Sequence, residues 1–343
     1  MRLAVVALAA TAMLPSCERK RSFAPSAVAS VDPPAPSATA SARAVANVSP
    51  ELSSPLADPP RVRVRVADDA RVLRPHAAVV DAHFGGPRAL ELQMVGLAGD
   101  RRAVLVSAAE GDARSMLLVV DGRNNLLWSR ERPLAGMRPG VRQVALCAGP
   151  DGEALAVWHD TDSSVVAARR WAADGGLLAD FTVMDADGCD AIAALYWPQH
   201  GWVIVASRQG SARAQLLGER GQRAWGNVGR SVAPGFRGPA PIGLALDGED
   251  GVVVVQPGYA ANGLTRDVAD RWFATRLDDG GRATWSAPID LGEAPRPGRA
   301  PLPKPQLSFV EDGVVAVTLA RGTTDAPIAY EIELTARGQV RVR

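Results

Sequence analysis

The chain has 343 residues, and its 38 basic and 37 acidic side chains give a formal net charge of +1. This balance lacks the positive bias that binding to a phosphate backbone normally needs, so nucleic acid is excluded as an expected partner. The length is sufficient for one large domain or two ordinary ones, and core size is therefore not limiting.

The N-terminus has the pattern of an export signal. An apolar run from Leu3 to Leu14 ends at Pro15-Ser16-Cys17. A dozen apolar residues are too few to span a bilayer as a helix, which needs about 20, but they are typical of a signal-peptide core. Leu14 to Cys17 resembles the bacterial lipobox. The resemblance implies that residues 1–17 are a lipoprotein signal peptide and that the Cys17 thiol is lipidated; an ordinary secretory signal is the alternative.

Residues 18–60 are rich in Ala, Pro and Ser with scattered charge. Such a segment has too little bulky apolar surface to offset its ordering entropy, so we expect a disordered tether. Glu18 follows the cysteine, whereas Asp at that place marks retention in the inner membrane of enterobacteria. The expected location is therefore the cell envelope, lipid-anchored through Cys17, in the outer rather than the inner membrane.

Short apolar runs separated by Gly/Asp turns begin near residue 90 and predict an all-β fold for the domain over residues 61–343. A turn followed by a strand-like run recurs every 49 to 62 residues, at Arg101, Gly152, Gly201, Gly251 and Gly313. This period lies within the range of propeller blades. Residues 61–66 and 77–80 are expected to supply strands of a partial extra blade.

A second pattern closes each unit: an apolar or small residue, Gly or Asn four positions later, and usually Trp four beyond. Its occurrences are Leu217-Gly221-Trp225, Leu277-Gly281-Trp285, Val120-Asn124-Trp128, and the degenerate Leu334-Gly338-Val342 and Ala172-Gly176-Asp180. The turn needs a residue that tolerates positive φ, and the Trp is expected to cap a sheet that packs face to face on its neighbour. We predict a β-propeller of five or six four-stranded blades, with tandem β-sandwiches as the alternative.

The hairpin resembles the repeat of quinoprotein-type (PQQ-like) propellers, in which an aliphatic residue, a Gly and a Trp recur in this order. That group includes dehydrogenases that carry pyrroloquinoline quinone and non-enzymatic lipoproteins of the outer-membrane β-barrel assembly machinery. The resemblance implies the fold far more than the function. It allows no cofactor-binding residue of the dehydrogenases to be carried over, so no such cofactor is expected.

Enzyme signatures such as G-x-S-x-G, H-E-x-x-H and the Walker loop are missing from the sequence. Asp185, Asp187 and Asp190 stand near one another as carboxylates do in calcium loops, because a hard cation takes several oxygens on one side of a tight turn. They are the candidate metal ligands, and a solvated acidic turn is the alternative interpretation.

One rim of a propeller carries the loops after each second strand and the loops that enter each blade, and it is the usual binding face. The expected rim residues are Glu110, Asp112, His159, Asp160, Asp162, Asp185, Asp187, Asp190, Arg208, Tyr259 and Arg321. His159, Asp160 and Asp162 are candidates to hold a metal or exchange protons. The loop over residues 256–271 is longer than its equivalents, and its Tyr259 and Arg266 are expected to contact a partner.

These observations predict a non-enzymatic envelope lipoprotein whose propeller is a binding or scaffold module for a protein or glycan partner. The alternative is a metal-dependent propeller hydrolase or lactonase with ligands from the inner strands and rim loops. Cys147 and Cys189 are expected to stay unpaired. Their places in adjacent blades separate them by about 20 Å at about 3.3 Å per residue, whereas a disulfide tolerates a Cα separation of about 4.4 to 6.8 Å.

The anchor gives the first prediction. Intact mass of the membrane-extracted protein is expected to match a chain that begins at a lipidated Cys17. Cys17→Ser is expected to release the protein, because each buried methylene of a lipid contributes about 0.8 kcal/mol to anchoring. Cys147→Ser is the control that stays bound. A mass equal to the unmodified chain, or a Cys17→Ser variant that remains equally membrane-bound, contradicts the lipoprotein interpretation.

Overall fold

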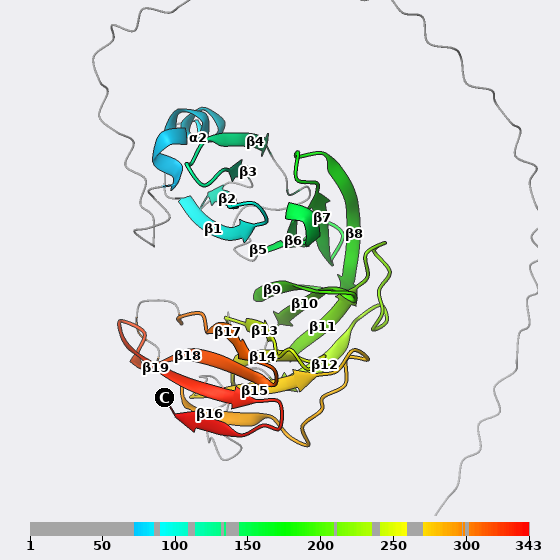
Figure 1. Ribbon diagram of the computed structural model, residues 1–343, viewed down its shortest axis with the longest axis vertical. Coiled ribbons are helices and arrows are strands. Elements are labelled where there is room, and N and C mark those ends of the chain that lie inside the picture. Colours follow the sequence, from blue (N-terminus) through cyan, green and yellow to red (C-terminus); the bar gives the residue numbers. More distant parts are fainter. Residues whose placement is uncertain are drawn as a thin grey trace, which may run out of the picture. The chain divides into compact units, whose positions relative to one another are not determined.

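The structure is a computed structural model, and it describes residues 72–85, 90–108, 114–131, 134, 144–208, 211–234, 241–258, 270–296, 298 and 302–342 (Figure 1). These residues all belong to one unit of the chain, residues 57–343. They form five four-stranded sheets, which we call sheets A to E in chain order. Among the described helices none is long and apolar enough to span a bilayer.

Each sheet is an antiparallel meander of four consecutive strands. Sheet A contains β1 (Leu90–Leu97), β2 (Arg101–Ala108), β3 (Ser115–Val120) and β4 (Leu126–Glu131). Sheet B contains β5 (Val144–Ala148), β6 (Ala154–Asp160), β7 (Val165–Trp171) and β8 (Leu177–Asp185). Sheet C contains β9 (Ala191–Trp197), β10 (Gly201–Arg208), β11 (Ser211–Leu217) and β12 (Arg230–Pro234). Sheet D contains β13 (Gly243–Leu246), β14 (Val252–Gly258), β15 (Arg271–Leu277) and β16 (Ile289–Glu293), and sheet E contains β17 (Gln306–Glu311), β18 (Val314–Thr323), β19 (Ala326–Thr335) and β20 (Val340–Val342).

Consecutive sheets pack on one another through both their faces and their first strands. The strands β1, β5, β9, β13 and β17 contact one another in that order. Four apolar clusters bridge sheets A and B, B and C, C and D, and D and E. The second strands are therefore buried on both faces and continuously apolar, as in Val252 to Val255, which are each at most 1% exposed. Tandem sandwiches would pair the sheets in twos, so this uninterrupted series confirms the predicted all-β propeller architecture.

The turn between the third and fourth strands has the same conformation in all five sheets. A residue with positive φ occupies its last position: Asn124, Gly175, Gly221, Gly281 and Gly338. The N–H of that residue donates to the carbonyl three positions earlier, which is the geometry of a three-residue hairpin loop with a bulge. In sheet B the positive φ lies at Gly175 rather than Gly176. The predicted alignment of that repeat is therefore wrong by one residue, and the repeat begins at the buried Trp171.

In sheets A, B and C, the aromatic ring that follows this turn packs on the turn glycine of the next sheet. A Cβ atom at Gly175 would lie 2.7 Å from the Trp128 ring, and one at Gly281 would lie 2.6 Å from the Trp225 ring. The indole Nε1 atoms of Trp128, Trp225 and Trp285 also donate to backbone carbonyls of the next turn, at 2.9, 2.8 and 2.8 Å. The hairpin pattern thus links each sheet to its successor, as predicted for the Trp positions.

Residues 77–80, expected as a strand, begin the helix α2 (Ala77–Phe84) instead. The short 3-10 helix η1 (Arg74–His76), which contains a proline in its first turn, leads into α2. Val80 and Phe84 lie four residues apart on the buried side of α2, where they pack on β2 and β3 of sheet A. Gly85 ends the helix at φ 72°. Residues 61–66, expected as a further strand, lie outside the described residues.

Cys147 on β5 and Cys189 before β9 are free thiols, as expected. Burial raises the pKa of both thiols to about 12. Because the thiolate is the reactive form, both side chains are expected to be poor nucleophiles and behave as small apolar residues.

The ring-on-glycine contact gives the second prediction. Trp225→Ala is expected to lower the free energy of unfolding by about 3–5 kcal/mol, because it removes a buried ring. Trp225→Phe is expected to cost about 1 kcal/mol for the lost Nε1 hydrogen bond. Gly281→Ala is expected to destabilise by more than about 1 kcal/mol, since its φ is 72° and its Cβ would meet the Trp225 ring.

Urea unfolding measures all three changes. Gly280→Ala is the matched control, because the neighbouring Gly280 has ordinary φ and its Cβ would meet nothing closer than 3.3 Å. Equal stability of the two Gly→Ala variants would show that the glycine contact does not hold sheets C and D together.

Candidate functional site

Loops of sheets B and C meet on one rim, where the rim prediction placed them. The Ala186 N–H donates to the Ser164 carbonyl at 3.0 Å, which joins the β8–β9 loop to the β6–β7 turn. The Asp190 N–H donates to the Ser207 carbonyl at 2.6 Å, which joins the same loop to the end of β10. The loop that enters sheet C is therefore held from both sides by backbone hydrogen bonds.

His159 adds a third hydrogen bond to this loop. Its Nε2 atom lies 3.0 Å from the Ala186 carbonyl oxygen and donates to it. The residue is only 5% exposed, at the end of β6. His159 thus positions the β8–β9 loop from beneath, whereas the sequence suggested a metal ligand or a proton-exchanging group.

Asp160 and Asp162 shape the turn next to this histidine. The Asp160 carboxylate accepts the Asp162 N–H at 2.9 Å and the Ser163 hydroxyl at 2.6 Å. Burial alone would raise the pKa of Asp160, but the hydrogen bonds from Ser163 and from the backbone outweigh it and lower the pKa. Asp160 is therefore an ionised turn residue, and Asp162 is exposed at the same turn.

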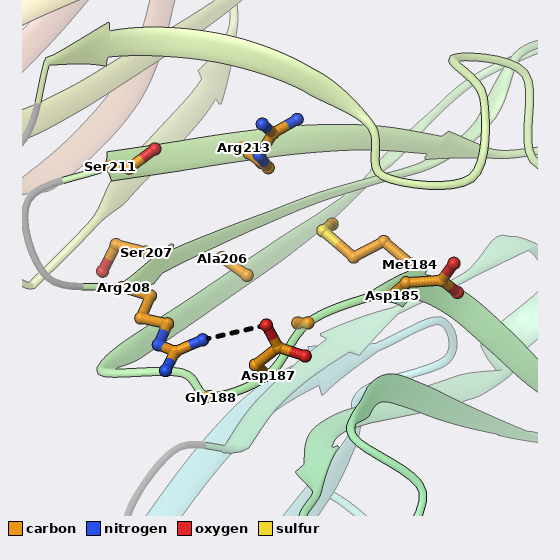
Figure 2. A pocket seen from close by; sticks show the side chains of 10 residues that line it. Met184, Asp185, Asp187, Gly188, Ala206, Ser207, Arg208, Ser211 and Arg213 are labelled. Carbon is orange, nitrogen blue, oxygen red and sulfur yellow. Dashed lines mark ion pairs between the residues drawn. The ribbon is translucent and has the colours of Figure 1, made fainter.

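A pocket of about 210 Å³ opens between the β8–β9 loop and the strands β10 and β11 (Figure 2). Its lining residues are Met184, Asp185, Ala186, Asp187, Gly188, Ala206, Ser207, Arg208, Ser211 and Arg213. Met184 and Ala206 are buried members of the apolar cluster between sheets B and C. The side chains of Asp187 and Arg208 are 88% and 43% exposed. The pocket therefore combines an apolar interior with a charged mouth.

Two of the three candidate calcium ligands line this pocket, but they pair with arginines. Asp187 lies 3.5 Å from Arg208, and Asp185 lies 3.1 Å from Arg223. No group of three or more His, Cys, Asp or Glu side chains that could hold a metal occurs within the described ranges. A guanidinium beside each carboxylate opposes cation binding, so the structure gives the calcium interpretation of Asp185, Asp187 and Asp190 no support.

Arg213 differs from Arg208, the other arginine that lines the pocket. It donates to the Val228 carbonyl at 3.3 Å, and within the part of the chain that the structure describes it has no acidic partner. Arg208 instead lies against the loop backbone, because a Cβ atom at Gly188 would sit 3.0 Å from its Nε. Gly188 thus allows the Arg208 side chain to cross the loop and reach Asp187.

Of the other predicted rim residues, the structure describes only Arg321. Arg321 stacks on Tyr330 within sheet E, 5.7 Å from the ring centre. Glu110, Asp112, Tyr259 and Arg266 lie outside the described residues. Sequence reasoning missed Met184, Ala206 and Arg213. The alternation Ser211-Ala212-Arg213-Ala214 in β11 could have shown that Arg213 points away from the core cluster that holds both alanines.

Comparisons with known proteins leave the family open. No family model and no curated protein matches the chain. Solved structures that resemble it include the SapL1 lectin in complex with alpha methyl fucoside, at 14% identity and a TM-score of 0.44 over 75% of this chain and 80% of that one. The β-propeller domain of the Trilobed protease from Pyrococcus furiosus matches at 10% identity and 0.39, over 73% and 71%. The PQQ domain of pyranose dehydrogenase from Coprinopsis cinerea matches at 11% and 0.40, over 73% and 77%.

The third prediction concerns the loop geometry. His159→Ala removes the donor to the Ala186 carbonyl, and a buried acceptor left unpaired costs about 1–3 kcal/mol. Hydrogen exchange of the amides at residues 184–190 is therefore expected to accelerate about tenfold or more through local opening. His200→Ala, in the β9–β10 turn, is the matched control. Unchanged exchange in the His159 variant would mean that the two backbone hydrogen bonds hold the loop alone.

Proposed function

We propose that the chain is a lipid-anchored envelope protein that binds a partner protein at the pocket between sheets B and C and performs no chemistry there. The observation that carries this proposal is a pocket whose β8–β9 loop is fixed by hydrogen bonds and whose Arg213 has no acidic partner among the described residues. Three hydrogen bonds fix the loop that forms one wall, so little ordering cost remains for binding.

The size and lining of the pocket favour a protein partner. Sites that enclose a small molecule typically measure about 300–1,000 Å³, whereas this pocket measures about 210 Å³ and suits a single inserted side chain. Arginine is enriched in protein–protein interfaces, and two arginines line the pocket. The metal-dependent hydrolase alternative has no supporting cluster of ligands among the described residues.

The export signal supports the cellular setting of this proposal. Lipid on Cys17 would hold the chain at a membrane, and residues 18–60 would act as the tether between the lipid and the propeller. A tethered binding domain meets an envelope partner at a raised effective concentration, so a modest pocket affinity suffices. The partner would be another envelope protein, and a glycan is the competing class that the experiment below distinguishes.

The fourth prediction tests the binding face. A photo-crosslinking amino acid at Ser211, exposed at the pocket, is expected to give one defined, protease-sensitive adduct in the intact envelope. The same amino acid at Glu219, exposed in the β11–β12 turn at the opposite end of sheet C, is the matched control and is expected to give none. Asp187→Trp, which places a bulky ring at the mouth, is expected to abolish the Ser211 adduct.

Four outcomes would overturn the proposal. Ser211 could give no adduct, or it could give the same adducts as Glu219. The Ser211 adduct could persist unchanged in the Asp187→Trp variant. An adduct that resists protease and is removed by glycosidases would replace the protein partner with a glycan.

A further inference from the structure

We propose that the group that enters the pocket is a carboxylate on an acidic side chain of the partner, held by the Arg213 guanidinium. This inference rests on the proposed function and adds the chemistry of the ligand. Its basis is an imbalance within the pocket, where, among the residues that the structure describes, every charged group of the lining except Arg213 has a partner of opposite sign.

The ion pairs account for the other charges. Asp185 is paired with Arg223 at 3.1 Å, and Asp187 faces Arg208 at 3.5 Å. Arg213 donates one hydrogen bond to the Val228 carbonyl, at 3.3 Å. A guanidinium has five N–H donors in a planar fork, so donors remain for a second acceptor. A carboxylate is the side-chain group whose two oxygens match that fork.

The geometry places these charges around an apolar interior. Figure 2 shows Arg213 on one side of the pocket and the Arg208–Asp187 pair on the other. Met184 and Ala206 are 1% and 7% exposed and lie at the buried end of the pocket. The methylene groups of a Glu side chain can pack on Met184 while its carboxylate meets Arg213. Arg208 gives a second cationic group nearby, because its contact with the exposed Asp187 is longer than a hydrogen bond.

The two aspartates of the lining, Asp185 and Asp187, limit which anionic groups can bind in the pocket. Two arginines and two aspartates line the pocket, so its summed formal charge is zero. A dianionic phosphate would meet both carboxylates at close range, and like charges repel. A singly charged carboxylate meets less repulsion and still pairs with Arg213. Among the described lining residues there is no aromatic ring on which a sugar could stack, which favours an acidic peptide over an acidic glycan.

The fifth prediction uses Met184 as the reporter. The full chain is labelled on the methionine methyl groups, and the Met184 signal is assigned with Met184→Leu. Titration with N-acetyl-glutamate N-methylamide is expected to shift that signal saturably. N-acetyl-glutamine N-methylamide, which has the same shape without the charge, is expected to bind at least tenfold more weakly. Glucuronate and inorganic phosphate are titrated separately, to test whether an acidic glycan or a phosphate group is the ligand of the pocket. Both are expected to bind more weakly than the glutamate derivative.

Variants assign the effect to Arg213. Arg213→Gln is expected to remove the preference for glutamate over glutamine, while the signal of the buried Met116 reports that the sheet A core is intact. Arg220→Gln, at an exposed turn of the same sheet, is the matched control and is expected to leave the preference unchanged. No saturable shift with the glutamate derivative, equal binding of the glutamine derivative, tighter binding of phosphate or glucuronate, or an unchanged preference in Arg213→Gln would each overturn the inference.

The two proposals fail separately. A Ser211 crosslink together with an unchanged Met184 signal in the glutamate titration would support the proposed binding face and contradict the inference that a carboxylate enters the pocket. A glutamate-dependent Met184 shift without any Ser211 adduct would establish the carboxylate pocket and reject the envelope partner at this face.

Discussion

An aromatic ring placed on the turn glycine of the next sheet is the contact on which the rest of this propeller depends. The turn must have positive φ and must lack a Cβ, and glycine satisfies both requirements at Gly175, Gly221 and Gly281. The ring then packs against the turn, and the indole Nε1 of Trp225 fixes its position by donating to the Asp279 carbonyl. This contact joins sheets A and B, B and C, and C and D. At the junction of sheets D and E the Trp285 indole donates to the Ala336 carbonyl at 2.8 Å, so each sheet is set at a defined position relative to its predecessor.

The junction between sheets B and C, where the pocket lies, departs from this pattern. Phe181 takes the place of tryptophan over Gly221 and has no N–H to donate. Arg170 supplies the missing polar link, since its guanidinium donates to the Glu219 carbonyl at 2.8 Å and lies 5.0 Å from the Trp202 ring centre. Glu153 pairs with the same arginine at 3.0 Å. At this turn the contact between sheets B and C is therefore maintained by an ion-paired arginine instead of an indole.

The sequence predicted the features that depend on short-range geometry. Positive φ at Asn124, Gly221, Gly281 and Gly338 could be recognised because the requirement lies within one turn. Ala77 to Val80 was misassigned because a short apolar run has no periodicity that distinguishes strand from helix. The helical conformation is favoured by the packing of Val80 and Phe84 on sheet A, which is a tertiary contact.

The site was predicted less completely, for a physical reason. His159 stands in the expected place on the rim, but its burial beneath the β8–β9 loop follows from packing between sheets. Met184 and Arg213 come from different sheets, and nothing in their separate strands indicates that they line one pocket. The pairing of Asp185 and Asp187 with arginines is likewise a tertiary fact, and it reverses the local resemblance to a calcium loop.

The two rims of the propeller therefore carry different constraints. On one rim, the turns between third and fourth strands receive rings and indole N–H groups from the preceding sheet, so a change in one turn alters the packing of its neighbour. Their glycines and carbonyls are committed to that contact. On the other rim, the β8–β9 loop is held by its backbone and by His159, while the side chains of Asp187 and Arg208 remain exposed. Exposed side chains on that rim can vary without disturbing the stacking of the sheets, and this freedom is what would allow a repeated fold to carry the recognition site that we propose.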